Sequence, residues 1–76
     1  MAPRLPVLKP NDVVHALERA GFYTHHQTGS HARLFYITRP ELRVTLPIHS
    51  KDLPPPLLKR ILKQASLTEE EFLKLL

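Results

Sequence analysis

The chain has 76 residues, and a domain of this length buries only about 60% of its unfolded surface, so one domain with a small core is expected. It contains no cysteine, which excludes disulfides and cysteine-based zinc sites and fits a reducing cytoplasm. The longest apolar run, residues 34–37, is far too short to span a membrane, and residues 1–6 lack the apolar core expected of a signal peptide. We therefore expect a soluble cytoplasmic protein whose small core benefits from a partner or from self-association.

The formal net charge of the chain is +4. In so small a domain this charge favours an anionic partner, with nucleic acid the first candidate, although charge alone fits simple solubility equally well. The distribution favours a partner, because the run of three glutamates is confined to residues 69–71 whereas basic residues follow the middle and later segments. The candidate nucleic-acid-contacting cations are Arg33, Arg43, Lys51, Lys59, Arg60 and Lys63.

The first elements are an extended arm and a helix. Residues 1–9 contain two prolines and no periodicity, which predicts the arm. Pro10 suits the first position of a helix, where its missing N–H costs nothing. Apolar residues then recur at helical spacing, and Gly21 ends the helix because glycine readily adopts a left-handed conformation. The apolar stripe consists of Val13, Val14, Leu17 and Ala20.

Three strands are expected next, over residues 22–27, 31–38 and 42–46, with turns at 28–30 and 39–41. Such short turns imply an antiparallel meander. Strict alternation in the first strand places His25 and His26 on opposite faces. The second strand is apolar on both faces, so its pattern does not show which side packs on the helices. An apolar outer face favours a binding partner or self-association.

The C-terminal part predicts two further helices. After a loop over residues 47–53 and three prolines, apolar residues at positions 57, 58, 61, 62 and 65 indicate an amphipathic helix. Thr68 and Glu71 have the spacing of a capping box, which begins a short last helix. The order αβββαα predicts an α+β domain with a three-stranded antiparallel sheet and helices on one face.

Five histidines are present, and two of them are candidates for chemistry. His31 follows Gly29 and Ser30, and a glycine turn permits close approach by a ligand. His49 lies in a loop before the basic helix. Adjacent strand residues point to opposite faces, so Ser30 and His31 are not expected to form a nucleophile pair. His15 is expected to be an ordinary surface residue.

A metal site combining His31, His49 and a third histidine is disfavoured, because the chain has no cysteine and no carboxylate at ligand spacing. No cofactor is expected. Phosphate-binding glycine loops, a nucleophile elbow and a catalytic triad are also missing from the sequence.

A histidine can move a proton without help near neutral pH, and RNA carries its own nucleophile in the 2′-hydroxyl group. A basic surface with one or two histidines therefore suffices for metal-independent RNA cleavage, with His31 as the general base. The alternative is a non-catalytic RNA-binding module in which His31 is structural. The presence of both His31 and His49 favours the enzyme, because binding needs only charge and hydrogen bonds.

Five blocks carry a resemblance over residues 10–73: LERAGF at 17–22, QTGSH at 27–31, VTLPIH at 44–49, KDLP at 51–54 and ILKQA at 61–65. In this order and spacing they resemble the HicA (YcfA-like) toxin family. The resemblance implies a single domain similar to the double-stranded-RNA-binding domain, with activity as an mRNA-cleaving ribonuclease. It also implies a HicB-type antitoxin that binds the toxin and masks its site.

The resemblance also assigns site residues. The family's catalytic histidine corresponds to His31, after the Gly29-Ser30 pair, and its second histidine corresponds to His49. Two positions depart from the family pattern. Ala32 stands where a polar residue or histidine is usual, and Lys9 stands where a Ser or Thr cap is common, which bears on rate and substrate handling.

Overall fold

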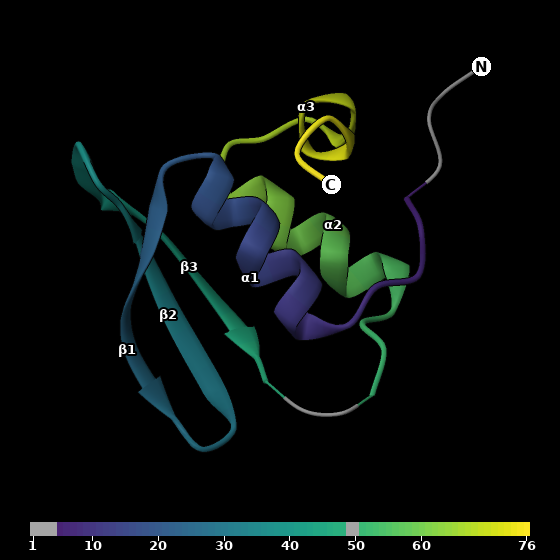
Figure 1. Cartoon of the computed structure of the whole chain (residues 1–76), viewed down its shortest axis with the longest axis horizontal. Helices are drawn as coiled ribbons and strands as arrows, with labels where there is room; N and C mark the ends of the chain where they lie inside the picture. The colour runs from purple at the N-terminus through teal and green to yellow at the C-terminus, as the bar shows by residue number, and fades with distance from the viewer. Residues whose placement is uncertain (1–4, 49–50) are drawn as a thin grey trace.

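The computed structural model describes residues 5–48 and 51–76, which fold into helices on one side of a single sheet (Figure 1). The elements are α1 (Pro10–Arg19), β1 (Phe22–Thr28), β2 (His31–Tyr36), β3 (Arg39–Pro47), α2 (Pro55–Gln64) and α3 (Glu69–Leu73). This order confirms the predicted α+β fold, with the αβββαα layout of a double-stranded-RNA-binding domain.

Helix α1 has the predicted ends. Pro10 is its first residue, and the side chain of Asp12 accepts a hydrogen bond from the Lys9 backbone N–H at 3.2 Å. Val13, Ala16 and Leu17 are buried. Gly21 follows the helix with a φ of +109°, a backbone conformation that residues with a Cβ atom rarely adopt. The chain thus turns sharply from α1 into β1.

The sheet is an antiparallel meander in the order β1-β2-β3, as predicted. Its inner face, toward the helices, includes Ala32 and Leu34 of β2 and Val44 and Leu46 of β3, all buried. This settles the orientation of β2, because Phe35 and the alternate residues before it then point to the outer face. The outer face is free of helices (Figure 1).

The core lies between the inner face and the helices. Leu58 and Ile61 of α2 and Phe72 of α3 are completely buried, and Phe22 packs edge-on against Tyr36 with ring centroids 5.1 Å apart. Within residues 5–48 and 51–76, no polar or charged residue is buried. Burial of apolar surface is therefore the main stabilising term of this core.

The predicted turn at residues 39–41 is wrong, since β2 ends at Tyr36, the turn lies at residues 37–38, and Pro40 belongs to β3. Phe35 pairs with Arg43 but Tyr36 pairs with Arg39, so Pro40 falls inside an irregularity of an edge strand. A proline is tolerated there because it need not donate to the ladder.

The predicted faces of β1 are also wrong. Thr24 pairs with Leu34 and His26 pairs with Arg33, which leaves His25 as the extra residue of a β-bulge. The bulge shifts the alternation by one residue, so His25 and His26 both lie on the outer face. This shift brings a second histidine to the face that carries His31.

The described part of the N-terminal arm is anchored. Leu8 forms an isolated antiparallel bridge with Leu53, whose N–H donates to the Leu8 carbonyl at 2.8 Å. Nearby, Lys9 Nζ lies 3.2 Å from Asp52 Oδ1.

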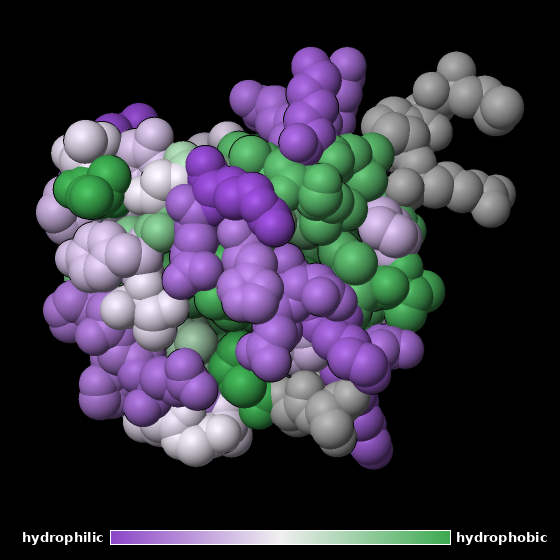
Figure 2. All heavy atoms as spheres, in the orientation of Figure 1, coloured by the Kyte–Doolittle hydropathy of each residue, from purple (hydrophilic) through white to green (hydrophobic). Residues whose placement is uncertain are grey.

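Figure 2 shows hydrophilic residues over the middle of the face in view and hydrophobic residues toward the N-terminal segment. No helix among the described residues is long and apolar enough to cross a membrane.

The last two helices meet at a tight turn. Ser66 has a φ of +57°, and the Leu67 N–H donates to the Leu62 carbonyl at 3.0 Å. The predicted capping box is confirmed: Thr68 Oγ1 accepts from the Glu71 N–H at 3.0 Å, and Glu71 Oε1 accepts from the Thr68 N–H at 2.9 Å. These bonds fix the start of α3 and thereby hold Phe72 in the core.

Candidate functional site

His31 begins β2 at the mouth of the turn. Ser30 Oγ lies 3.0 Å from His31 Nδ1, and Thr28 Oγ1 donates to the His31 carbonyl at 3.4 Å. The expectation that Ser30 and His31 point apart is wrong, because Ser30 belongs to the turn and does not follow strand alternation. With Nδ1 engaged, Nε2 is the ring nitrogen left for a substrate.

Around His31 the outer face of the sheet is hollowed. The hollow has a volume of about 470 Å³, and His26, Thr28, His31, Arg33 and Thr45 line it. Strand pairing explains why these residues lie together, because His26, Arg33 and Thr45 are cross-strand neighbours in β1, β2 and β3. All five residues are exposed. The hollow thus combines two imidazoles, a guanidinium and two hydroxyls, which suits an anionic ligand that exchanges a proton.

Sequence reasoning did not select His26 for the site. Strict alternation predicts that His26 shares a face with Phe22, and the bulge at His25 moves it to the opposite face. A bulge depends on how the partner strand pairs, so the local pattern of β1 carries little signal for it. The adjacent pair of histidines was the one visible hint.

Gly29 lies in the turn before Ser30. Of the two glycines, only Gly21 has a positive φ, so the conformation of the turn does not itself require glycine at position 29. A Cβ atom built on Gly29 meets nothing within 4 Å. The space beside Gly29 is therefore open, and a ligand bound in the hollow can approach the backbone of the turn.

The predicted basic residues lie in different places. Arg33 lines the hollow, and Arg43 lies on the same outer face, with its guanidinium carbon 5.2 Å from the centroid of the Phe35 ring. Lys59 and Lys63 instead line a separate hollow between α2 and α3, where Lys59 Nζ is 3.9 Å from Glu69 Oε1. Arg33 and Arg43 are the cations that the fold brings to the face of His31.

The other predicted site residues are placed as follows. Arg60 is exposed on α2, one helical turn before Gln64, whose side chain accepts a hydrogen bond from the Thr45 N–H at 3.1 Å. Lys51 is exposed in the loop before α2. His49 lies outside the described residues. Just before it, the Ile48 N–H donates to the Ser30 carbonyl at 2.7 Å.

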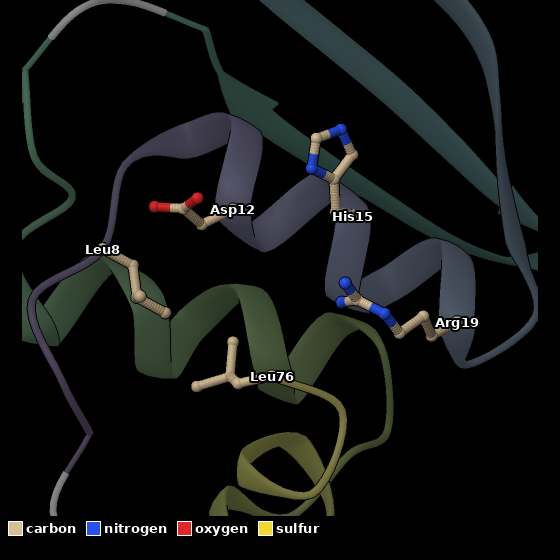
Figure 3. A pocket seen from close by; sticks show the side chains of 5 residues that line it. All are labelled: Leu8, Asp12, His15, Arg19 and Leu76. Carbon is tan, nitrogen blue, oxygen red and sulfur yellow. The ribbon is translucent and has the colours of Figure 1, made fainter.

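A further hollow, of about 330 Å³, lies on the exposed side of α1 (Figure 3). Two of its three polar residues have partners within the fold: Arg19 donates to the Leu75 carbonyl at 2.8 Å, and Asp12 accepts from the Lys9 N–H. Figure 3 shows His15 and Arg19 projecting from α1, with Leu76 nearby. This arrangement serves mainly to hold the C-terminal segment, so the outer face of the sheet is the better candidate site.

The groups that could hold a metal ion are few. Within residues 5–48 and 51–76, no three histidine, cysteine or carboxylate side chains are gathered in a suitable cluster. His26 and His31 share the hollow with Arg33, whose positive charge opposes cation binding. The arrangement favours an anion, such as a phosphate group, over a cation.

The fold and the placement of these groups define a small domain of the double-stranded-RNA-binding-domain layout, with histidine and arginine on the open face of its sheet. Comparison with known families gives the identity within this class: residues 10–67 match the HicA toxin of bacterial toxin–antitoxin systems. The match covers most of the chain, which therefore belongs to the HicA toxin family. The predicted resemblance is confirmed. No individual curated protein gives a significant match.

Proposed function

We propose that this toxin is a metal-independent endoribonuclease that cleaves mRNA, with His31 as the general base. The observation that carries the proposal is the exposed imidazole of His31, oriented by Ser30 and facing a hollow that also contains Arg33. Membership of the toxin family supports a toxic activity, and RNA is the substrate class that these groups suit best.

The chemistry follows from the placement of these groups. His31 Nε2 accepts the proton of a ribose 2′-hydroxyl, and the 2′-oxygen attacks the adjacent phosphorus. The bond to the 5′-oxygen breaks, and that oxygen takes a proton from an acid. The products are a 2′,3′-cyclic phosphate and a 5′-hydroxyl. Arg33 neutralises charge on the phosphate as it develops.

Two histidines are candidates for the acid. His49 corresponds to the second histidine of the family pattern, and His26 lines the same hollow as His31. Comparing His26→Ala with His49→Ala distinguishes them, since loss of the acid slows cleavage most for substrates with a poor leaving group. Restoration of the rate by an activated leaving group identifies the donor.

The decisive experiment incubates purified protein with end-labelled RNA, with and without a chelator. His31→Ala should lower turnover by roughly 10²–10⁴-fold, the range for one general acid–base group. His15→Ala is the matched control, because His15 is an exposed histidine of α1 on a different surface. A single 2′-deoxyribose at the cleavage point should block the reaction.

Other outcomes contradict parts of the proposal. Full activity of His31→Ala rejects the residue, undiminished cleavage of the deoxy substrate rejects the 2′-hydroxyl mechanism, and loss of activity with chelator rejects metal independence. Binding of RNA without any cleavage establishes the alternative, a non-catalytic RNA-binding module on the same face.

The partner of a toxin of this family is an antitoxin, and we propose that a HicB-type protein covers the outer face of the sheet around His31. The exposed Tyr23 and the partly exposed Phe35 support this choice, because both leave apolar ring surface accessible on this face. A partner that binds only the folded toxin raises its melting temperature as partner concentration increases. The same partner should block cleavage, and a partner that does neither contradicts the assignment.

A further inference from the structure

Beside the hollow, the outer face of the sheet carries a compact cluster of rings. His25 and Phe35 are stacked, with centroids 4.3 Å apart and an interplanar angle of 14°. Tyr23 lies 6.3 Å from both rings and is 41% exposed. The Arg43 guanidinium lies over the Phe35 ring at 5.2 Å. We call these four residues, Tyr23, His25, Phe35 and Arg43, the stacking cluster.

The register explains the cluster and relates it to the site. Tyr23, Phe35 and Arg43 are cross-strand neighbours in β1, β2 and β3, and the bulge adds His25 to the same face. Along β2, Phe35 is four residues from His31, a separation of about 13 Å. The cluster and the hollow are therefore neighbouring parts of one continuous surface, within the span of a short stretch of RNA.

The order of the groups leaves two stacking planes available. Phe35 comes from the middle strand, with the His25 ring of β1 stacked on it and the Arg43 guanidinium of β3 over its ring. Both of these outer groups are exposed. A further planar ring can extend the stack beyond His25 or beyond Arg43. A guanidinium also contributes a cation–π attraction and a contact to phosphate.

This chemistry suits an unpaired nucleobase, because the cluster consists of aromatic rings and a cation. Aromatic side chains on an open sheet stack the bases of unpaired RNA in other binding modules, and stacking combined with nearby cations is the usual way to hold a single strand. A base in a duplex is already stacked and does not reach such a surface.

We propose that the stacking cluster is a subsite that holds one unpaired nucleobase of the substrate, close to the phosphate cleaved at His31. The subsite selects single-stranded over double-stranded RNA and fixes the position of the cleaved bond relative to the bound base. This inference rests on the proposed ribonuclease function for its substrate, but its test measures binding and does not require cleavage.

The test uses the uncleaving His31→Ala protein and short single-stranded RNAs with 2-aminopurine at successive positions. Fluorescence should be quenched at one position beside the cleavage point, and much less elsewhere. Introducing Phe35→Leu should abolish this quenching and weaken binding roughly 5- to 150-fold, the range for one stacked base. Ile37→Ala is the matched control, because Ile37 is 68% exposed in the neighbouring turn, outside the cluster.

Arg43→Lys separates stacking from charge. Lysine keeps the positive charge but loses the planar guanidinium, so binding should weaken while its salt dependence stays nearly the same. An RNA duplex of the same sequence should compete poorly. Circular dichroism and thermal melting establish that each variant is folded before its binding is compared.

The possible results separate this inference from the proposed function. Cleavage by the natural protein, with uniform quenching and unchanged binding by Phe35→Leu, overturns the subsite and leaves the ribonuclease in place. Localised quenching that Phe35→Leu removes, without cleavage by the natural protein, establishes the subsite and rejects the enzyme. If Phe35→Leu weakens antitoxin binding but not RNA binding, the cluster is a protein-docking surface and the inference fails.

Discussion

The substitution Gly21→Ala tests the connection between α1 and β1. Gly21 has a φ of +109°, where a residue with a Cβ atom is strained by about 1–3 kcal/mol. The added Cβ would also lie 3.0 Å from Tyr36 Cε1 and 3.3 Å from Tyr36 Cζ. Tyr36 cannot move freely, because its ring packs against Phe22 in the core.

Both effects lower the free energy of unfolding. Overpacking against an ordered ring typically costs about 1–3 kcal/mol, so the total loss is on the order of 2–6 kcal/mol. A core of this size supplies about 3–5 kcal/mol of net stability. Gly21→Ala should therefore remove most of the stability and lower the melting temperature by roughly 10–50 °C.

Gly29→Ala is the matched control, since a Cβ there meets nothing within 4 Å and Gly29 has no positive φ. Urea and thermal unfolding should show Gly29→Ala equal to the natural protein, or more stable by about 0.4–1 kcal/mol. Adding Tyr36→Leu to Gly21→Ala should recover the packing part of the loss but not the backbone part. Equal stability of the two glycine variants would refute this account of the connection.

Four further outcomes are expected. Ser30→Ala should slow RNA cleavage about 2- to 10-fold by releasing the His31 ring, and Ser30→Thr should restore the rate in the same kinetic assay. Arg33→Gln should reduce the salt dependence of RNA binding by about one unit of slope in a fluorescence titration. Ser66→Gly should stabilise the protein by up to about 1 kcal/mol in urea, because φ is +57° there. The Thr68 backbone N–H, and to a smaller extent the Thr68 hydroxyl, hold the pKa of Glu71 below its usual 4.5. The stability that ionised Glu71 contributes is therefore complete above about pH 4.5 and is lost as the pH falls through the lowered pKa. In urea unfolding at different pH values, Glu71→Gln should remove this loss.

Local signals predicted the helices correctly. Pro10, Gly21 and the Thr68–Glu71 pair act within one turn of chain, so the residues alone determine where α1 and α3 begin and where α1 ends. The same holds for the inward residues of β3, since Val44 and Leu46 alternate with exposed neighbours. The family could also be predicted, because five short sequence blocks occur in a fixed order, and the match over residues 10–67 confirms it.

Features that depend on strand pairing were not predictable in this way. The bulge at His25 and the place of Pro40 in β3 are set by the register with β2, which the sequence of one strand does not contain. The orientation of β2 required knowing that helices bury Leu34, since both of its faces are apolar. The contact of Ser30 with His31 likewise depends on the shape of the turn.

These limits explain why the site was only partly foreseen. His31 and Arg33 were selected from their own neighbourhood in sequence, and the structure places both at the hollow. His26 and the rings beside Phe35 come from different strands and meet only after pairing. The basic residues of α2 resembled those of the sheet in composition, and only the fold shows that Lys59 and Lys63 line another hollow.

The bond from the Thr45 N–H to the Gln64 side chain has a consequence for how the protein behaves at high concentration. An uncovered sheet edge can recruit the strands of other molecules and start a polymer. Along β3, the Thr45 N–H already donates to the Gln64 side chain, and Pro40 has no N–H to offer a neighbouring strand. Along β1, the extra residue at His25 breaks the regular spacing of the backbone hydrogen-bonding groups. The irregularities that shape the outer face of the sheet thus also discourage edge-to-edge aggregation of a small toxin.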